Sequence, residues 1–145
     1  MITVDEMMTT GAKTLRAEDN LANVQAALAR YNCHHIPIVN ANNELDGLVS
    51  QRDVLRVTES SLSGVETTLN PEEVLISEFM IRDVFTVEPE TSLRKAAIYI
   101  RTQRYGCLPV VKDNKFVGII TDSDFVNIAI DLLEQIEEAE SADQD

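Results

Sequence analysis

The chain has 145 residues, 44% of them hydrophobic, and a formal net charge of -13 at pH 7. This length suits one domain or two small halves that share a core, and the apolar content excludes a wholly disordered chain. The negative charge argues against nucleic-acid binding, because it repels phosphodiester backbones. The first residues lack the pattern of a signal peptide and no apolar run approaches the ~20 residues of a membrane span, so we expect no membrane association. Two cysteines without a CxxC spacing favour a reducing cytoplasm.

Residues 1–58 predict one compact α+β unit. In chain order we expect an extended piece, a helix, two strands joined by an asparagine-rich turn, and a second helix: 13–17, 21–31, 35–39, 45–49, and the segment that follows Asp53. Asp19 or Asn20 offers a side-chain oxygen that can cap the start of the first helix.

A polar connection at 59–77 leads to a second unit at 78–133 with the same order of elements. Its extended piece, first helix, strands and second helix are expected at 85–89, 93–100, 107–111, 115–120 and after Asp124. Thr91 or Ser92 can cap its first helix, and Asp113-Asn114 suits a turn with positive φ. Its long second helix has an expected apolar face of Phe125, Ile128, Ala129, Leu132 and Leu133. The tail at 134–145 carries six acids and no base, so we expect the helix to fray there into a solvated segment.

An internal duplication relates the two units. At an offset of 72 residues, identical residues recur: Met8 and Met80, Thr14 and Thr86, Leu21 and Leu93, Pro37 and Pro109, and Val39 and Val111. At an offset of 71, "GLVSQRD" (47–53) meets "GIITDSD" (118–124). Two units that are each too small to bury an apolar face can bury both by packing together, so we expect a pseudo-symmetric module.

The two heptapeptide motifs carry the chemistry that the sequence offers. Ser50 and Thr121 place a hydroxyl at the start of a predicted helix, where unpaired N–H groups and the helix dipole favour a phosphate. Asp53 and Asp124 add a carboxylate, which can accept both hydroxyl protons of a ribose diol. The glycine that opens each motif is expected to let the backbone approach a ligand closely. The motifs therefore indicate a nucleotide site.

The duplicated elements, "IPIV" and "LPVV" before the turns, and the two motifs together resemble a tandem pair of cystathionine-β-synthase (CBS) domains, often called a Bateman module. The resemblance covers nearly the whole chain outside the linker and the acidic tail. It implies an α+β, sandwich-like fold in which two strand–helix–strand–strand–helix repeats pack through their sheets and leave two clefts. It also implies a regulatory protein and not an enzyme. Such a protein binds an adenosine-containing ligand (AMP, ADP, ATP or S-adenosylmethionine), requires no cofactor, forms a homodimer and signals to a partner protein.

In the geometry of the family, each motif works with the opposite repeat. The implied Asp124 cleft combines Ile119, Thr121 and Asp124 with Ala17, Ala22, and the backbone from Cys33 through His34 to His35. The implied Asp53 cleft combines Val49, Ser50, Arg52 and Asp53 with Pro89, Arg94, and the segment from Tyr105 through Gly106 to Cys107. Arg52 and Gln51 stand where the second copy has Ser123 and Asp122. We therefore expect the Asp53 cleft to accept more phosphate charge, and the Asp124 cleft to favour adenosine or AMP.

Other interpretations of the same residues stay open. The motif hydroxyls and carboxylates can be helix caps and nothing more. His34 and His35 are adjacent on a strand and point to opposite faces, so they cannot chelate one metal ion, and a packing role is favoured. The sequence contains no P-loop, serine-hydrolase or zinc-protease motif. The competing function is a ligand-free module that uses the same fold for dimerisation and protein interaction.

Overall fold

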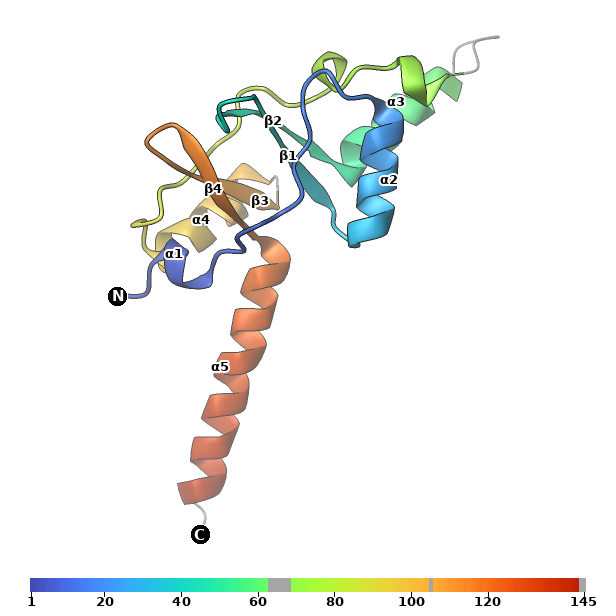
Figure 1. Ribbon diagram of the computed structural model, residues 1–145. Helices are drawn as coiled ribbons and strands as arrows, with labels where there is room; N and C mark the ends of the chain where they lie inside the picture. The colour runs from blue at the N-terminus through green and yellow to red at the C-terminus, as the bar shows by residue number, and fades with distance from the viewer. Residues whose placement is uncertain (63–68, 105, 144–145) are drawn as a thin grey trace.

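The computed structural model describes residues 1–62, 69–104 and 106–143, and its elements follow the predicted duplication (Figure 1). In chain order they are α1 (Val4–Met7), α2 (Leu21–Tyr31), β1 (His35–Val39), β2 (Leu45–Ser50), α3 (Gln51–Leu62), the short 3-10 helices η1 (Pro71–Glu73) and η2 (Ile76–Glu78), α4 (Leu93–Gln103), β3 (Cys107–Lys112), β4 (Lys115–Thr121) and α5 (Asp122–Asp143). The first repeat contains β1–β2 with α2 and α3, and the second contains β3–β4 with α4 and α5.

Each repeat is built on an antiparallel hairpin with the same register. His35 pairs with Ser50 at the open end of β1–β2, and Cys107 pairs with Thr121 at the open end of β3–β4. Both ladders shift register at equivalent positions near the turn. In the second turn Asp113 has the predicted positive φ, because a short polar side chain tolerates the left-handed region. The duplication in sequence is therefore a duplication of backbone geometry.

The extended pieces predicted at 13–17 and 85–89 are shorter in the structure. Leu15 and Val87 each form a single parallel bridge to the first strand of their own hairpin. The chain turns directly afterwards, where the Asp19 carboxylate and the Thr91 hydroxyl accept N–H hydrogen bonds from three residues earlier. The turn leaves no room for a longer strand.

The structure selects one of the two candidate caps at each first helix. Asn20 caps α2 by accepting a hydrogen bond of 2.9 Å from the N–H of the third helical residue. Ser92 caps α4 in the same way at 3.1 Å. Because Asp19 and Thr91 are used in the preceding turns, equivalent positions have equivalent roles in both repeats.

The leading segments of the two repeats are exchanged in space. Val4 of α1 is fully buried in the core of the second repeat, together with Leu93 of α4. Figure 1 shows α1 beside α4, although these two helices lie far apart in the sequence. In the reciprocal arrangement, Ile76 of η2 is fully buried in the core of the first repeat, together with Leu21 of α2. Each core is therefore completed by the segment that precedes the other repeat.

Backbone pairing follows the same exchange. Thr9 pairs with Ile119 of β4 through hydrogen bonds of 2.9 and 3.0 Å, and Ile81 pairs with Leu48 of β2 through two hydrogen bonds of 2.9 Å. Contacts thus run between residues 1–58 and residues 78–133. These bounds remain a prediction for the extent of the two sequence repeats.

The motif glycines make room for these crossing segments. A Cβ on Gly47 would lie 2.6 Å from the Ile81 carbonyl oxygen, and one on Gly118 would lie 2.7 Å from the Met8 sulfur and 3.0 Å from the Thr9 carbonyl oxygen. Both glycines are buried beneath these segments. The expectation that they admit a ligand is therefore wrong, since the space above them is filled by the exchanged chain.

The two hairpins pack face to face, as predicted. Leu48, Cys107 and Ile119, which come from β2, β3 and β4, form a buried cluster between the repeats. The hairpins are also joined near their turns, where the Phe116 N–H donates to the Asn43 carbonyl at 2.9 Å and the Asn43 side chain donates back at 2.8 Å. This contact fixes how the ends of the strands face each other.

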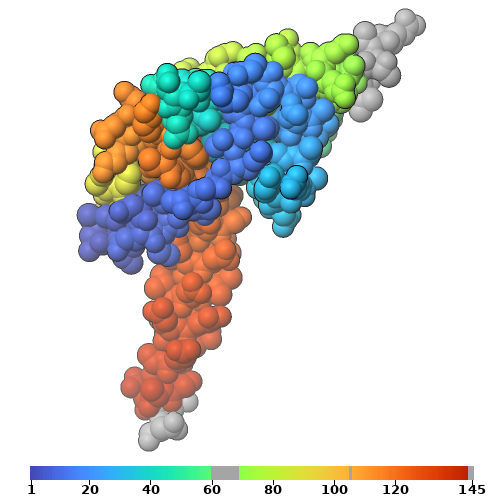
Figure 2. All heavy atoms as spheres, viewed as in Figure 1, coloured from blue at the N-terminus to red at the C-terminus, as the bar shows by residue number. Residues whose placement is uncertain are grey.

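Helix α5 differs from the prediction in length and in packing. It continues to Asp143, through most of the segment expected to fray. Phe125 and Ile128 pack against the second core, whereas Leu132 and Leu133 are 52% and 57% exposed, because the helix runs past the edge of the core. Figure 2 shows the helix standing clear of the body. Among the described residues, no helix combines the length and apolar character needed to cross a membrane.

Candidate functional site

Two clefts lie beside the contact between the hairpins, and each begins where a strand runs directly into a helix. β2 ends at Ser50 and α3 begins at Gln51, while β4 ends at Thr121 and α5 begins at Asp122. The predicted starts of both helices are too late, because each motif aspartate is the third residue of its helix. We name the clefts after these aspartates.

The hydroxyl and the carboxylate of each motif bond to their own main chain. Asp53 Oδ2 accepts hydrogen bonds from the Ser50 N–H and hydroxyl at 2.8 and 2.9 Å, and Ser50 Oγ accepts one from the Asp53 N–H at 3.2 Å. Asp124 Oδ2 accepts a hydrogen bond from the Thr121 N–H at 2.8 Å, and Thr121 Oγ1 accepts one from the Asp124 N–H at 3.2 Å. These are capping boxes. The capping interpretation is confirmed, and any role in ligand binding must be additional to it.

Asp53 and Asp124 differ in how much of the carboxylate is left for a ligand. Asp53 is 1% exposed, and its Oδ1 is buried without a hydrogen bond, 3.0 Å from Arg56 Nη2. Asp124 is half-buried, and its Oδ1 accepts no hydrogen bond from the residues that the structure describes. A sugar diol therefore has direct access to Asp124, whereas at Asp53 it must first displace Arg56.

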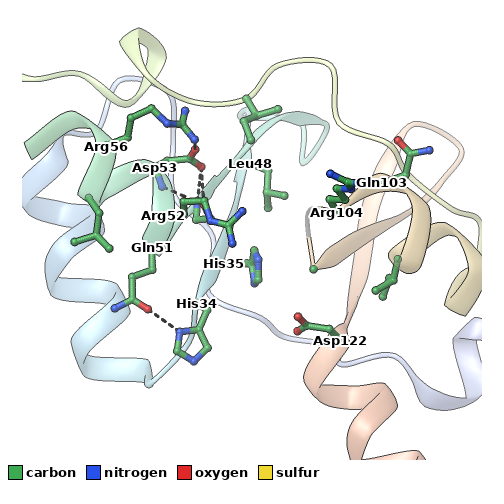
Figure 3. A pocket seen from close by; sticks show the side chains of 15 residues that line it. His34, His35, Leu48, Gln51, Arg52, Asp53, Arg56, Gln103, Arg104 and Asp122 are labelled. Atoms are coloured by element: carbon green, nitrogen blue, oxygen red, sulfur yellow. Dashed lines mark hydrogen bonds and ion pairs between the residues drawn. The ribbon is translucent and has the colours of Figure 1, made fainter. Parts of the chain in front are cut away.

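The Asp53 cleft has a volume of about 630 Å³ and is bounded by both repeats. Four of the residues predicted for it line it: Ser50, Arg52, Asp53 and Gly106. Figure 3 shows Arg52 and Asp53 on one side of the cleft and Arg104 on the other, with His35 between the two sides. The lining of this cleft therefore combines the motif of the first repeat with residues of the second.

Two arginines of this cleft are not among the predicted lining residues: Arg56 is not singled out by the sequence, and for Arg104, at a helix end, a solvated role is favoured over phosphate capture. Arg56 lies one turn after Asp53 on α3, so it shares the face of the helix that carries the motif. Arg104 is the C-cap of α4 with a φ of 63°, and the duplication pairs it with Asn32, the C-cap of α2 with a φ of 47°. Because Asn32 directly precedes the predicted Cys33, the same offset could have identified Arg104.

The Asp124 cleft has a volume of about 600 Å³. Six residues predicted for it line it: Ile119, Thr121, Asp124, Cys33, His34 and His35. Here too the motif of one repeat faces the start of the hairpin in the other repeat.

An aromatic side chain at the Asp124 cleft is a second feature that the sequence analysis missed. The spacing of Leu21, Val24, Leu28 and Tyr31 predicts Tyr31 on the apolar face of α2. In the structure Tyr31 is 49% exposed and lines the cleft with Lys13. Lys13 Nζ and Arg30 Cζ each lie 5.6 Å from the centre of the Tyr31 ring, within the range of cation–π interactions. The equivalent position of the second repeat is Gln103, which lines the Asp53 cleft.

Six of the predicted residues line neither cleft: Ala17, Ala22, Val49, Pro89, Arg94 and Cys107. Val49, Pro89 and Cys107 are buried, and Ala17 packs against the first core, so these side chains contribute to packing. Arg94 is exposed on α4. The predicted Tyr105 lies outside the described residues.

The two clefts differ in charge. The Asp53 cleft is lined by Arg52, Arg56 and Arg104 against two carboxylates, and the Asp124 cleft is lined by one lysine against two carboxylates. Asp122 is one of the carboxylates in each cleft. The Asp53 cleft is therefore the more positive of the two, and its greater acceptance of phosphate charge stays a prediction.

The thiols near the clefts have pKa values above the ordinary range. Burial raises the pKa of Cys107, and the negative charges of Asp122 and Asp124 raise it further because they disfavour a thiolate. Partial burial raises the pKa of Cys33. Neither thiol has the lowered pKa of a reactive nucleophile.

The histidines lie between the clefts and line both. His34 Nδ1 and Gln51 Oε1 form a hydrogen bond of 2.9 Å. Within residues 1–62, 69–104 and 106–143, no three His, Cys, Asp or Glu side chains are grouped as a metal site.

The duplicated fold and its paired clefts correspond to a CBS domain pair. The CBS domain family matches the chain twice, at residues 4–60 and 76–131, and the chain belongs to this family. A solved Vibrio cholerae structure, described as an acetoin utilization protein (AcuB), is 44% identical to it. The two superpose with a TM-score of 0.85 over 94% of this chain and 98% of that one.

Two solved structures with bound ligands share the fold at lower identity. CBSX2 in complex with AMP is 23% identical, with a TM-score of 0.77 over 91% of this chain and 98% of that one. The CBS domain pair of protein MJ0100, in complex with 5'-methylthioadenosine and S-adenosyl-L-methionine, is 22% identical, with a TM-score of 0.76 over 88% and 95%. The chain spans 42% of the length of the first curated relative that it matches and 24%, 23% and 24% of the next three.

Proposed function

We propose that the chain is a regulatory module that binds adenosine-containing ligands in its two clefts and signals their occupancy to a partner protein. The observation that carries the proposal is the pair of clefts, each of which combines the hydroxyl-and-carboxylate motif of one repeat with the opposite repeat. The ligands in the CBSX2 and MJ0100 structures support it, since both contain adenosine. Because the Vibrio relative is named for acetoin utilization, proteins of acetoin metabolism are the first partners to test.

The Asp53 cleft is the proposed site for ligands with several phosphates. Arg52 and Arg104 approach it from opposite repeats, so together they can hold a di- or triphosphate through charge-assisted hydrogen bonds. The positive end of the α3 dipole adds to this preference for negative charge. Nearly complete burial of the Asp53 carboxylate favours recognition of the phosphates over recognition of the sugar.

The Asp124 cleft is the proposed site for adenosine, AMP or S-adenosylmethionine. Asp124 Oδ1 is the acceptor for the ribose hydroxyls, and the exposed Tyr31 ring offers a stacking surface for adenine, worth roughly 1–3 kcal/mol for a base on an aromatic side chain. Asp122 lowers the affinity of this cleft for further phosphates by repulsion.

Calorimetric titration with AMP, ATP and S-adenosylmethionine tests both assignments. The matched variants are Arg52→Glu and Ser123→Glu, because both positions are exposed, equivalent in the duplication and outside the capping hydrogen bonds between motif residues. Arg52→Glu is expected to weaken ATP binding in the Asp53 cleft at least tenfold and to leave AMP binding in the Asp124 cleft unchanged. Ser123→Glu is expected to weaken AMP binding in the Asp124 cleft and to leave ATP binding in the Asp53 cleft unchanged. A ligand at 100 times its Kd should stabilise the fold by about 2.7 kcal/mol and raise Tm by roughly 5–10 °C. If no adenosine ligand gives heat or a shift in Tm, the proposal is wrong.

A second candidate function is a ligand-free module for dimerisation and partner docking. It is favoured by the capping role of both aspartates and by the exposed apolar residues Val126, Ile130 and Leu133 on α5. A homodimer that buries the first half of α5 is compatible with either function. The titration separates them, because the ligand-free module predicts no nucleotide-dependent change.

A further inference from the structure

The two clefts share a wall. His34, His35 and Asp122 line both of them. Equivalent main-chain hydrogen bonds hold this wall, since the Gln51 N–H donates to the His34 carbonyl and the Asp122 N–H donates to the Gly106 carbonyl, both at 2.9 Å. Each bond joins the first residue of a helix to the residue that precedes the hairpin. The position of the wall is therefore fixed by the backbone of both repeats.

The wall is asymmetric in charge. The first repeat places the neutral Gln51 beside His34, and the second repeat places Asp122 over Gly106. Gly106 has a φ of 70° and no side chain. A Cβ there would lie 2.9 Å from Asp122 Oδ2 and 3.5 Å from His35 Cε1. The Asp122 carboxylate thus occupies space that a side chain at 106 would take, and Figure 3 shows it near His35.

The charge of Asp122 is not neutralised by a neighbouring cation. The side chain is exposed, and its Oδ1 accepts a hydrogen bond of 2.8 Å from the Ser123 N–H. Across the described part of the chain it forms no ion pair with a lysine or arginine. Because the carboxylate borders both clefts, an anionic ligand in either one experiences its repulsion.

We propose, on the basis of the function proposed above, that Asp122 couples the two clefts negatively for anionic ligands. The hydrogen bond from the Asp122 N–H to the Gly106 carbonyl holds the backbone, so only the side chain of Asp122 can move. A phosphate in the arginine-rich Asp53 cleft repels its carboxylate toward the Asp124 cleft. The second anionic ligand then meets Asp122 and Asp124 together. Coupling between two binding sites in proteins commonly amounts to a factor of about 5–150, and we expect about tenfold here. A neutral nucleoside carries no charge to repel, so adenosine is expected to show no coupling.

Calorimetric titration with AMP measures this coupling. Arg52→Glu reports the Asp124 cleft alone, and Ser123→Glu reports the Asp53 cleft alone. For independent clefts, the product of the two wild-type dissociation constants equals the product of the two single-cleft constants. We expect the wild-type product to be about tenfold larger. In an Asp122→Asn background the two products are expected to agree within about twofold.

A matched control removes the same charge elsewhere on α5. Asp131→Asn is expected to leave the tenfold difference, because residue 131 lies about 13 Å farther along the helix and lines neither cleft. Absence of any binding would overturn the proposed function and the coupling together. Binding to both clefts with equal products would overturn the coupling and leave the proposed function standing. If Asp131→Asn also removed the tenfold difference between the products, or if adenosine gave the same difference, the assignment of the coupling to the charge of Asp122 would be overturned.

Discussion

Substituting alanine for Gly47 is expected to lower the free energy of unfolding by about 3 kcal/mol. The added Cβ would lie 2.6 Å from the Ile81 carbonyl oxygen and 2.9 Å from the Met80 sulfur. The sulfur is at the end of a flexible side chain, but the carbonyl belongs to the backbone that pairs with Leu48 through two hydrogen bonds. Displacing Ile81 weakens both bonds without breaking them, at about 0.5 kcal/mol each, and the residual overpacking costs about 1–3 kcal/mol.

Urea unfolding followed by circular dichroism measures this loss, and Tm is expected to fall by roughly 6–12 °C. Gly11→Ala is the control, because Gly11 has a φ of 69° and an added Cβ would meet no atom within 4 Å, so its cost is confined to backbone strain of about 1–2 kcal/mol. A Gly47→Ala protein within about 0.5 kcal/mol of the wild type would refute the idea that the motif glycine accommodates the exchanged segment.

Three further outcomes are expected. Asp53→Asn should cost about 2 kcal/mol in urea unfolding, because the buried side chain loses its ion pair with Arg56. A cost below about 0.5 kcal/mol would show that this ion pair does not stabilise the fold. Cys33 should react with a thiol reagent at pH 8 in the folded protein and be protected by AMP. Cys107 should not react, because burial and two aspartates raise its pKa and keep the thiol protonated. Equal reaction rates for the two cysteines would argue against the buried environment of Cys107. Leu133→Gln should change the unfolding free energy of the monomer by less than about 0.5 kcal/mol relative to the wild type, but shift the sedimentation of the proposed dimer toward the monomer. An unchanged dimer would exclude this face of α5 from the interface.

Features that depend on neighbouring residues could be predicted from the sequence. The caps of α2 and α4 follow from a polar side chain before an apolar period, and the structure places Asn20 and Ser92 there. The positive φ of Asp113 follows from the tolerance of aspartate for that region. The packing of two hairpins follows from the duplication, because neither repeat can bury its apolar face alone.

Features that depend on long-range contacts could not be predicted in this way. In the sequence, Val4 and Ile76 are apolar residues just before the elements of each repeat. Their neighbours in sequence do not indicate that Val4 completes the core of the second repeat and Ile76 the core of the first. For the same reason the sequence assigns the buried glycines to ligand approach, although Met8 and the carbonyl of Ile81 occupy the space above them. Leu133 has the period of a core residue, but the core ends before it.

The candidate site shows the same division. Ser50, Asp53 and their counterparts could be found because the motif is local, and the opposite repeat could be found because the family resemblance implies it. Arg104 was not predicted as a lining residue and Asp122 was predicted only for the Asp124 cleft, since their places in the Asp53 cleft depend on how two hairpins face each other. The duplication is the available signal for Arg104, since this residue corresponds to Asn32, which directly precedes the predicted Cys33.

The exchange of the leading segments delays the folding of the chain during its synthesis on the ribosome. The first half stays incomplete until residues 69–81 have been synthesised, and the N-terminal turn of helix has no place to dock until β4 emerges. Nascent intermediates therefore expose Val4 for most of translation. A gene cut between the repeats would give two products, each carrying the missing piece of the other, so mixing the halves should restore a folded pair that neither half reaches alone.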